Sequence, residues 1–272
     1  DLEAFKQRAS ALCGLDLHLH LLLPIGWGIS ESSCFVVYDQ LDQMDAEKRL
    51  AVSRKGGKAF LWADRLRLAA AVASAASHLR SCLLGSPHLN LKLSSVVFDR
   101  TGQVKLADLG FQGPSFEGGS LGLQSKKAEG GSLVSQQVAE LQDLGRLLFE
   151  LLLPSSAAVH TAVQAAVEME TVRPSELFAR LGSKSDPSAV WPAAAAHDLA
   201  IVALQCTLAE AGGSVPPPGM TNIAGMLLHQ CQRSRHVEGA SFSGFEAAFD
   251  CTYSSQLDVS SLSNEKRFWV RH

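Results

Sequence analysis

The sequence predicts an α+β protein that forms one large domain or two small ones. Short apolar runs typical of strands lie near the start of the chain, and a small hairpin pattern lies in the middle. Apolar residues at helical spacing dominate the second half. The chain has 272 residues, of which 46% are hydrophobic. This length and composition are sufficient for a sizeable core and exclude disorder of the whole chain.

Charge and composition exclude several classes of function. Lys and Arg total 24 and Asp and Glu total 27, so the near-neutral balance argues against a dedicated nucleic-acid binder. No apolar run approaches the roughly 18 residues of a membrane span, so we expect no membrane partner. The chain opens without Met or a signal peptide, as a piece of a longer protein would. Six scattered cysteines without a CxxC pair indicate reduced thiols, a cytoplasmic or nuclear location and no zinc site.

The first sixty residues predict a helix followed by a β-hairpin. Residues 1–15 have apolar side chains at helical spacing. The apolar runs 19–29 and 34–41, joined by the polar residues 30–33, predict the hairpin. His18 and His20 alternate, and without a third ligand nearby we expect a partly exposed strand rather than a metal pair. Residues 42–58 are polar and are expected to form a loop.

The middle of the chain predicts a long helix and a second hairpin. Residues 62–82 have an apolar, alanine-rich face, with Arg65, Arg67 and Arg80 off it. Two short apolar runs, 95–99 and 104–106, are joined by a polar turn. Residues 110–131 are rich in Gly and Ser and are expected to form a long loop.

The second half predicts mainly helices. Residues 134–153 place five leucines on one side, and Pro154 ends this pattern. Further helices are expected over residues 160–168, 174–181, 193–210 and 221–231. After residue 232 the chain is polar and irregular, apart from the aromatic segments 242–249 and 267–270.

Two blocks of sequence resemble the catalytic segments of protein kinases. Residues 88–98, HLNLKLSSVVF, resemble the catalytic loop H-R-D-x-K-x-x-x-N and the short strand that follows it. Residues 104–110, VKLADLG, resemble the strand that leads into the D-F-G motif, at the spacing that the family shows. The resemblance therefore implies a kinase-like fold.

Four other segments resemble kinase elements in the same order. Residues 35–41 resemble the hinge between the lobes, and residues 61–69 resemble the helix start W-x-x-R-x-x-I-A of plant receptor-like kinases. Residues 143–150 resemble the central helix of the large lobe. Residues 199–207 with 217–220 resemble L-x-x-I-A-L-x-C-T followed by R-P-x-M, which favours the tyrosine-kinase-like branch that includes Pelle. The resemblance implies a partial small lobe over 1–41, a large lobe over 42–231 and an extension over 232–272.

The resemblance also implies which residues would form the site. The hinge-like residues that would hold a nucleotide are Tyr38, Asp39, Gln40 and Leu41. Asp108 matches the aspartate of D-F-G and would bind magnesium, and Ser95 matches the second metal-binding position. Lys92 matches the lysine of the catalytic loop, and Asn90 stands at the position of the catalytic base.

Departures from the kinase pattern predict impaired catalysis. Asn90 has a neutral amide where the family has a carboxylate that accepts the substrate proton. Ser95 is a poorer metal ligand than asparagine, and Leu89 replaces the arginine of H-R-D. Arg8 falls near the position expected for a helix glutamate, and the chain contains neither a glycine-rich loop nor the strand lysine.

These departures favour a pseudokinase that acts as a binding or scaffold module in signalling, with protein partners and no cofactor. The alternative is an active Ser/Thr kinase that uses Mg-ATP and whose missing loop and lysine lie outside this chain. Phe268 and Trp269 are candidate interface residues, because aromatic side chains dominate binding hot spots. The other possibility is that the aromatic tail packs on its own domain.

Overall fold

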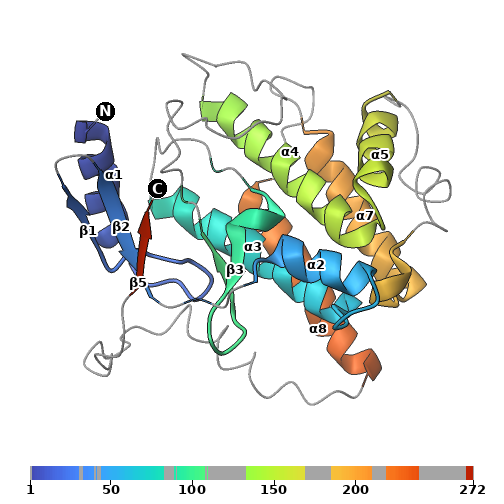
Figure 1. Ribbon diagram of the computed structural model, residues 1–272. Coiled ribbons are helices and arrows are strands. Elements are labelled where there is room, and N and C mark those ends of the chain that lie inside the picture. The colour runs from blue at the N-terminus through green and yellow to red at the C-terminus, as the bar shows by residue number, and fades with distance from the viewer. Residues whose placement is uncertain are drawn as a thin grey trace.

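The computed structural model describes residues 2–30, 33–39, 41, 44–82, 89, 91–107, 109, 133–168, 185–209, 219–238 and 268–271. Its elements, in chain order, are α1 (Leu2–Cys13), β1 (Gly26–Ile29), β2 (Cys34–Tyr38), α2 (Ala46–Arg54), α3 (Trp62–Cys82), η1 (Leu93–Ser95), β3 (Val96–Phe98), β4 (Val104–Leu106), α4 (Leu133–Leu152), α5 (Ser156–Glu168), η2 (Pro187–Ala189), α7 (Ala193–Thr207), α8 (Met220–Glu238) and β5 (Phe268–Arg271). A small sheet and α1 lie on one side, and the remaining helices lie on the other (Figure 1). This arrangement confirms the α+β prediction.

The small sheet has the strand order β1-β2-β5. β1 and β2 form the predicted antiparallel hairpin, and β5 pairs antiparallel with the other edge of β2, with Trp269 opposite Val37. The predicted first strand was too long, because it begins at Gly26 rather than at residue 19. Residues 20 and 22 instead bond to the end of β4: Leu106 N donates to His20 O (2.8 Å) and Leu22 N donates to Leu106 O (2.9 Å).

The prediction of a loop over residues 42–58 was wrong, because helix α2 lies within it. Asp45 caps this helix by accepting a hydrogen bond from Lys48 N at 2.8 Å. The helix buries Ala46, Leu50 and Ser53 and exposes Glu47 and Lys48. The buried positions are few and one of them is polar, so the sequence pattern concealed the helix.

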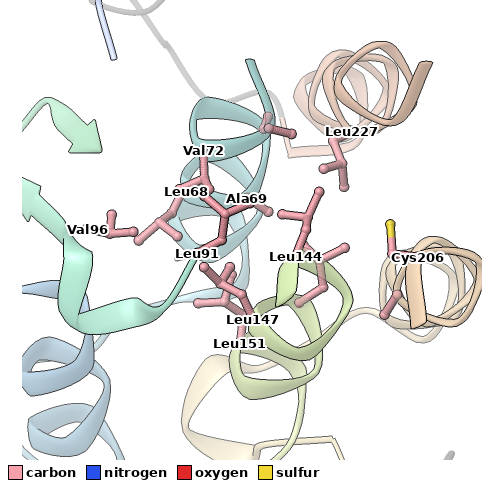
Figure 2. Close-up of a cluster of buried hydrophobic side chains, with 14 of the residues drawn as sticks. Leu68, Ala69, Val72, Leu91, Val96, Leu144, Leu147, Leu151, Cys206 and Leu227 are labelled. Atoms are coloured by element: carbon pink, nitrogen blue, oxygen red, sulfur yellow. The ribbon is translucent and has the colours of Figure 1, made fainter. Parts of the chain in front are cut away.

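The core lies between the long helices. α3 packs against α8, and α4 packs against α7. Figure 2 shows Ala69 of α3, Leu144 and Leu147 of α4, Cys206 of α7 and Leu227 of α8 in one cluster, with Leu68 of α3 directed toward Val96. Leu144 and Leu148 of α4 are fully buried, as the predicted apolar face requires.

Most of the remaining predicted elements are present. β3 and β4 form the second predicted hairpin, and α5, α7 and α8 coincide with predicted helices. α8 extends to Glu238, beyond the predicted end at residue 231. The predicted loop 110–131 and the predicted segments 174–181 and 242–249 lie outside the described residues. Among the residues that the structure describes, no helix has both the length and the apolarity needed to cross a bilayer.

Arg65 was predicted to lie off the buried face of α3, but its side chain is completely buried. Its guanidinium donates from Nε to Phe60 O (2.8 Å) and from Nη1 to Leu151 O (2.8 Å). Nη1 also donates to Asp186 Oδ2 at 2.8 Å, and Nη2 donates to Ser188 Oγ at 2.9 Å. Apolar spacing cannot predict that a charged residue is buried. Arg65 can be buried because its hydrogen-bond acceptors and the carboxylate of Asp186 compensate for the loss of water.

Asp186 is the acidic partner in this network and is also buried. Burial alone would raise the pKa of its carboxyl group. The hydrogen bonds from Ser188 and Arg65, together with the positive charge of Arg65, outweigh burial and lower this pKa. The carboxylate therefore stays ionised and also accepts a hydrogen bond from Arg54 Nε at 3.1 Å. In this way α2, α3 and η2 are joined to the end of α4.

Gly145 allows α4 and α7 to approach closely. A Cβ atom at this position would lie 2.5 Å from Thr207 Oγ1 and 2.8 Å from both Ala203 O and Thr207 N. Two of these three atoms belong to the backbone of α7, so the neighbouring helix would have to move.

We therefore expect Gly145→Ala to lower the free energy of unfolding by about 1–3 kcal/mol, although alanine is the better helix former. The matched control is Gly225→Ala on α8, where an added Cβ meets nothing within 4 Å. That change should raise the free energy of unfolding by up to about 1 kcal/mol. Urea denaturation of both variants measures the difference, and equal effects would contradict the close approach of α4 and α7.

Candidate functional site

The hinge-like segment joins the small sheet to the helical part. β2 ends at Tyr38, and Leu41 forms an isolated antiparallel bridge with Asp99, which directly follows β3. Tyr38 and Leu41 are half-buried, while Asp39 is exposed. Gln40 lies outside the described residues. The structure therefore places the described part of this segment beside the central hairpin.

A side chain of α4 holds the segment that matches the catalytic loop through a hydrogen bond. Leu89 N donates to Glu140 Oε1 at 3.0 Å, and Arg80 Nε donates to Glu140 Oε2 at 2.7 Å. Glu140 is buried, so its carboxylate needs both of these partners. Leu89 and Leu91 are themselves buried. His88 and Asn90 lie outside the described residues.

Ser95 and Lys92 lie at opposite ends of one short turn. Lys92 is half-buried and directly precedes η1, of which Ser95 is the last residue. Ser95 is 3% exposed, and among the described residues its Oγ has no hydrogen-bond partner. Its carbonyl oxygen accepts a hydrogen bond from Ala107 N at 2.8 Å. Ser95 therefore lies beside the segment that leads into Asp108, a residue outside the described part.

Arg8 reaches the same segment from the small-lobe side. Its guanidinium donates from Nε to Leu109 O at 2.9 Å, and its Nη2 donates to the same oxygen. Leu109 is 1% exposed and Arg8 is half-buried, so this contact is partly shielded from water. The sequence placed Arg8 near the position of a kinase glutamate. The structure shows that a positive charge lies at this position, next to the residue after Asp108.

Two described residues bear on whether this site could hold a magnesium–nucleotide complex. Magnesium in proteins prefers carboxylate oxygens, whereas Ser95 offers one neutral hydroxyl. Arg8 adds a positive charge beside Leu109, the residue that follows Asp108 in the sequence. Within the described ranges, no group of three or more His, Cys, Asp or Glu side chains is arranged to hold a metal ion.

The two histidines predicted to alternate on a partly exposed strand lie in a buried, irregular segment instead. His18 is 8% exposed and His20 is 2% exposed. The His18 ring stacks on His78 of α3, with ring centroids 4.7 Å apart. His20 Nδ1 donates to Val104 O at 3.0 Å, and His20 N donates to His18 Nδ1 at 3.2 Å. The strand prediction was wrong because Leu21 N donates to His18 O at 3.1 Å, so the chain turns here instead of staying extended.

The neutral forms of these histidines are favoured. Burial lowers the pKa of His18 to about 4, and repulsion from His78, His20 and Lys105 adds to the effect. Burial also lowers the pKa of His20, against the opposing hydrogen bond to Val104. Protonation of His18 Nδ1 would in addition remove the acceptor of the hydrogen bond from His20 N.

We expect stability to fall on mild acidification. A folded pKa of about 4 against 6.5 in the unfolded chain means that the unfolded state binds the proton more readily. The stabilisation from neutral His18 is present above pH 6.5 and is lost as the pH falls toward 4. At about 1.36 kcal/mol per unit, the loss between pH 7 and pH 5 is about 2 kcal/mol.

Urea denaturation at pH 7 and pH 5 measures this loss. His18→Gln should reduce the dependence on pH, whereas His160→Gln on the exposed side of α5 should leave it unchanged. An equal pH dependence in the wild type and His18→Gln would show that His18 titrates normally.

Sequence reasoning missed Glu140 as a residue that supports the site. The available signal was its spacing, because residue 140 lies four positions before the buried Leu144 and shares its helix face. An acidic residue on an apolar face indicates a buried partner. That the partner is the backbone of Leu89 depends on the chain path and could not be inferred from spacing.

Comparisons with known proteins extend this description. No protein-family model and no curated protein sequence matches the chain. Its structure is similar to that of the apo GRMZM2G135359 pseudokinase, with a TM-score of 0.59 and 16% identity, over 85% of this chain and 74% of that one. It is also similar to the pseudokinase DRIK1 (drought responsive inactive kinase 1) bound to ENMD-2076, with a TM-score of 0.60 and 18% identity, over 85% and 76% of the two chains.

A third similar structure is the pseudokinase domain of BIR2, an immune regulator of the RLK/Pelle family. Here the TM-score is 0.61 and the identity 20%, over 91% of this chain and 74% of that one. The TM-scores of 0.59 to 0.61 establish a shared fold, and identities of 16 to 20% establish no more than the fold. The chain therefore has the protein-kinase-like fold that these three pseudokinases share.

Proposed function

We propose that this chain is a catalytically impaired protein-kinase-like domain of the tyrosine-kinase-like, Pelle and receptor-like branch. The observation that supports this most directly is the pair of substitutions at the site. Asn90 replaces the carboxylate that would accept the substrate proton, and Arg8 places a cation against Leu109. Both changes act on the charges that phosphoryl transfer requires.

Its proposed role is to bind other proteins, as a scaffold or an allosteric partner in signalling. A kinase-like fold whose catalytic charges are replaced retains a large, well-packed surface that can still bind a partner. We propose that no cofactor is needed and that nucleic acid and membrane are not partners. The reduced thiols expected from the cysteine pattern favour a cytoplasmic or nuclear location.

The alternative proposal is an active Ser/Thr kinase whose glycine-rich loop and lysine lie outside this chain. The observation in its favour is the buried Oγ of Ser95, for which the described part of the chain provides no hydrogen-bond partner. Lys92 and Asp108 also keep the residue types of the kinase pattern. The two proposals differ in one measurable property, which is phosphate transfer.

We expect the chain to transfer no phosphate to generic protein substrates. Incubation with labelled ATP and magnesium should give no more signal than a heat-denatured control, because several catalytic groups are replaced together. Asn90→Asp should not restore transfer, since Arg8 and the lack of a strand lysine remain. Transfer above the control that Asp108→Ala abolishes would instead establish the active-kinase proposal.

The interface proposal concerns Phe268 and Trp269. β5 pairs with β2 inside the chain, so one backbone edge of these residues is already used internally. Whether their side chains also contact another protein stays a prediction. Trp269→Ala should leave the melting temperature nearly unchanged and weaken partner binding by about 2 kcal/mol or more, close to 30-fold.

The measurement is titration of the purified chain against a partner first identified by cross-linking in cells. His160→Ala on exposed α5 is the control. A sharp fall in the melting temperature of Trp269→Ala would show that this residue belongs to the chain's own core.

A further inference from the structure

The segment around Asp108 is held by the chain itself on both sides. On the side before it, Leu106 N donates to His20 O and Leu106 O accepts from Leu22 N, while Ala107 N donates to Ser95 O. Lys105 Nζ donates to Leu19 O at 2.6 Å. These contacts fix β4 and its exit to two neighbouring segments, residues 19–22 and η1.

On the side after Asp108, Arg8 holds Leu109. The guanidinium donates two hydrogen bonds to a single carbonyl oxygen, and a charged donor makes each of these bonds stronger than a neutral one would. The partners lie 101 positions apart in the sequence. The contact therefore ties helix α1 directly to the end of the central hairpin.

α1 itself is firmly seated, so Arg8 is a fixed donor. Ala9 and Leu12 of this helix are completely buried, and Leu12 lies four residues after Arg8 on the same helix face. At the other end of the helix, Phe5 meets Trp27 of β1 edge-to-face, with ring centroids 5.9 Å apart. A helix docked by its apolar face restricts the positions that the Arg8 side chain can reach.

We infer that Arg8 is a positioning residue that holds the Asp108 segment against α1 in place of a bound ligand. We call its two hydrogen bonds to Leu109 O the Arg8 clamp. A metal ion that binds with a ligand also dissociates with it, whereas the guanidinium of Arg8 is a permanent part of the chain. This inference rests on the proposed function and deepens it, because it makes the surface formed by α1 and this segment independent of nucleotide.

Hydrogen–deuterium exchange of the full chain tests the clamp. The amides of Leu106 and Ala107 are bonded, and so they report whether the segment is held. In the wild type, exchange of peptides covering residues 104–109 should be unchanged by Mg-ATP or by magnesium alone. Arg8→Ala should accelerate that exchange at least tenfold while leaving the peptides of α4 unchanged.

Matched variants separate the clamp from helix packing. Arg8→Met keeps the apolar stem and should exchange as fast as Arg8→Ala. Arg8→Lys keeps the charge but loses the paired donors of the guanidinium, and so it should restore only part of the protection. Lys6→Ala, which removes the exposed Glu3 ion pair of the same helix, is the control and should behave as the wild type.

Two outcomes would overturn the inference: added protection of residues 104–109 by Mg-ATP in the wild type, or equal exchange in Arg8→Ala and Lys6→Ala. If Arg8→Ala does not fold, the inference is still tested by exchange of the wild type with and without Mg-ATP and by exchange of Arg8→Lys. Failure of the clamp is distinguishable from failure of the proposed function, because the latter is decided by phosphate transfer.

Discussion

The buried guanidinium of Arg65 is the contact on which the helical part depends most. It is enclosed by the start of α3, the end of α4 and η2, and it bonds both to backbone carbonyls and to Asp186. A charge in this position is costly unless every donor has an acceptor, so the surrounding segments must take up one arrangement together. Leucine packing alone would allow those segments to slide, whereas directional hydrogen bonds fix their register.

The first part of the chain is held to the central hairpin mainly by main-chain hydrogen bonds. Residues 19–22 bond to β4 with their backbone and to Lys105 through Leu19 O, so the start of the chain is joined to the central hairpin by main-chain contacts. The neutral histidines His18 and His20 fill the space beside this join. Arg8 adds a third contact from α1. The site is therefore held largely by polar contacts, while apolar side chains fill the space between the large helices behind it (Figure 2).

Much of the fold could be predicted because apolar periodicity directly reports burial. Residues 62–82 and 134–153 became α3 and α4 almost to the residue, since long amphipathic helices give the strongest pattern. Arg65 and Glu140 could not be found in this way, because each is a charged residue on an apolar face whose partner comes from a distant segment. The position of Arg8 followed from the kinase resemblance, but its contact with Leu109 depends on how α1 docks. Helix α2 was missed because Asp45 and a few buried residues make a weak signal.

The pairing of β5 with β2 has a consequence for the order in which this chain can fold. Val37 and Trp269 lie opposite each other in one sheet (Figure 1), although they are far apart in the sequence. The hairpin of β1 and β2 can form early, but its second edge is filled only after residues 268–271 have been synthesised. Until then β2 presents unpaired backbone groups to other chains, which is the usual origin of edge-to-edge aggregation. Slow synthesis of the segment between these strands would prolong this exposed state, so the yield of native protein should depend on β5.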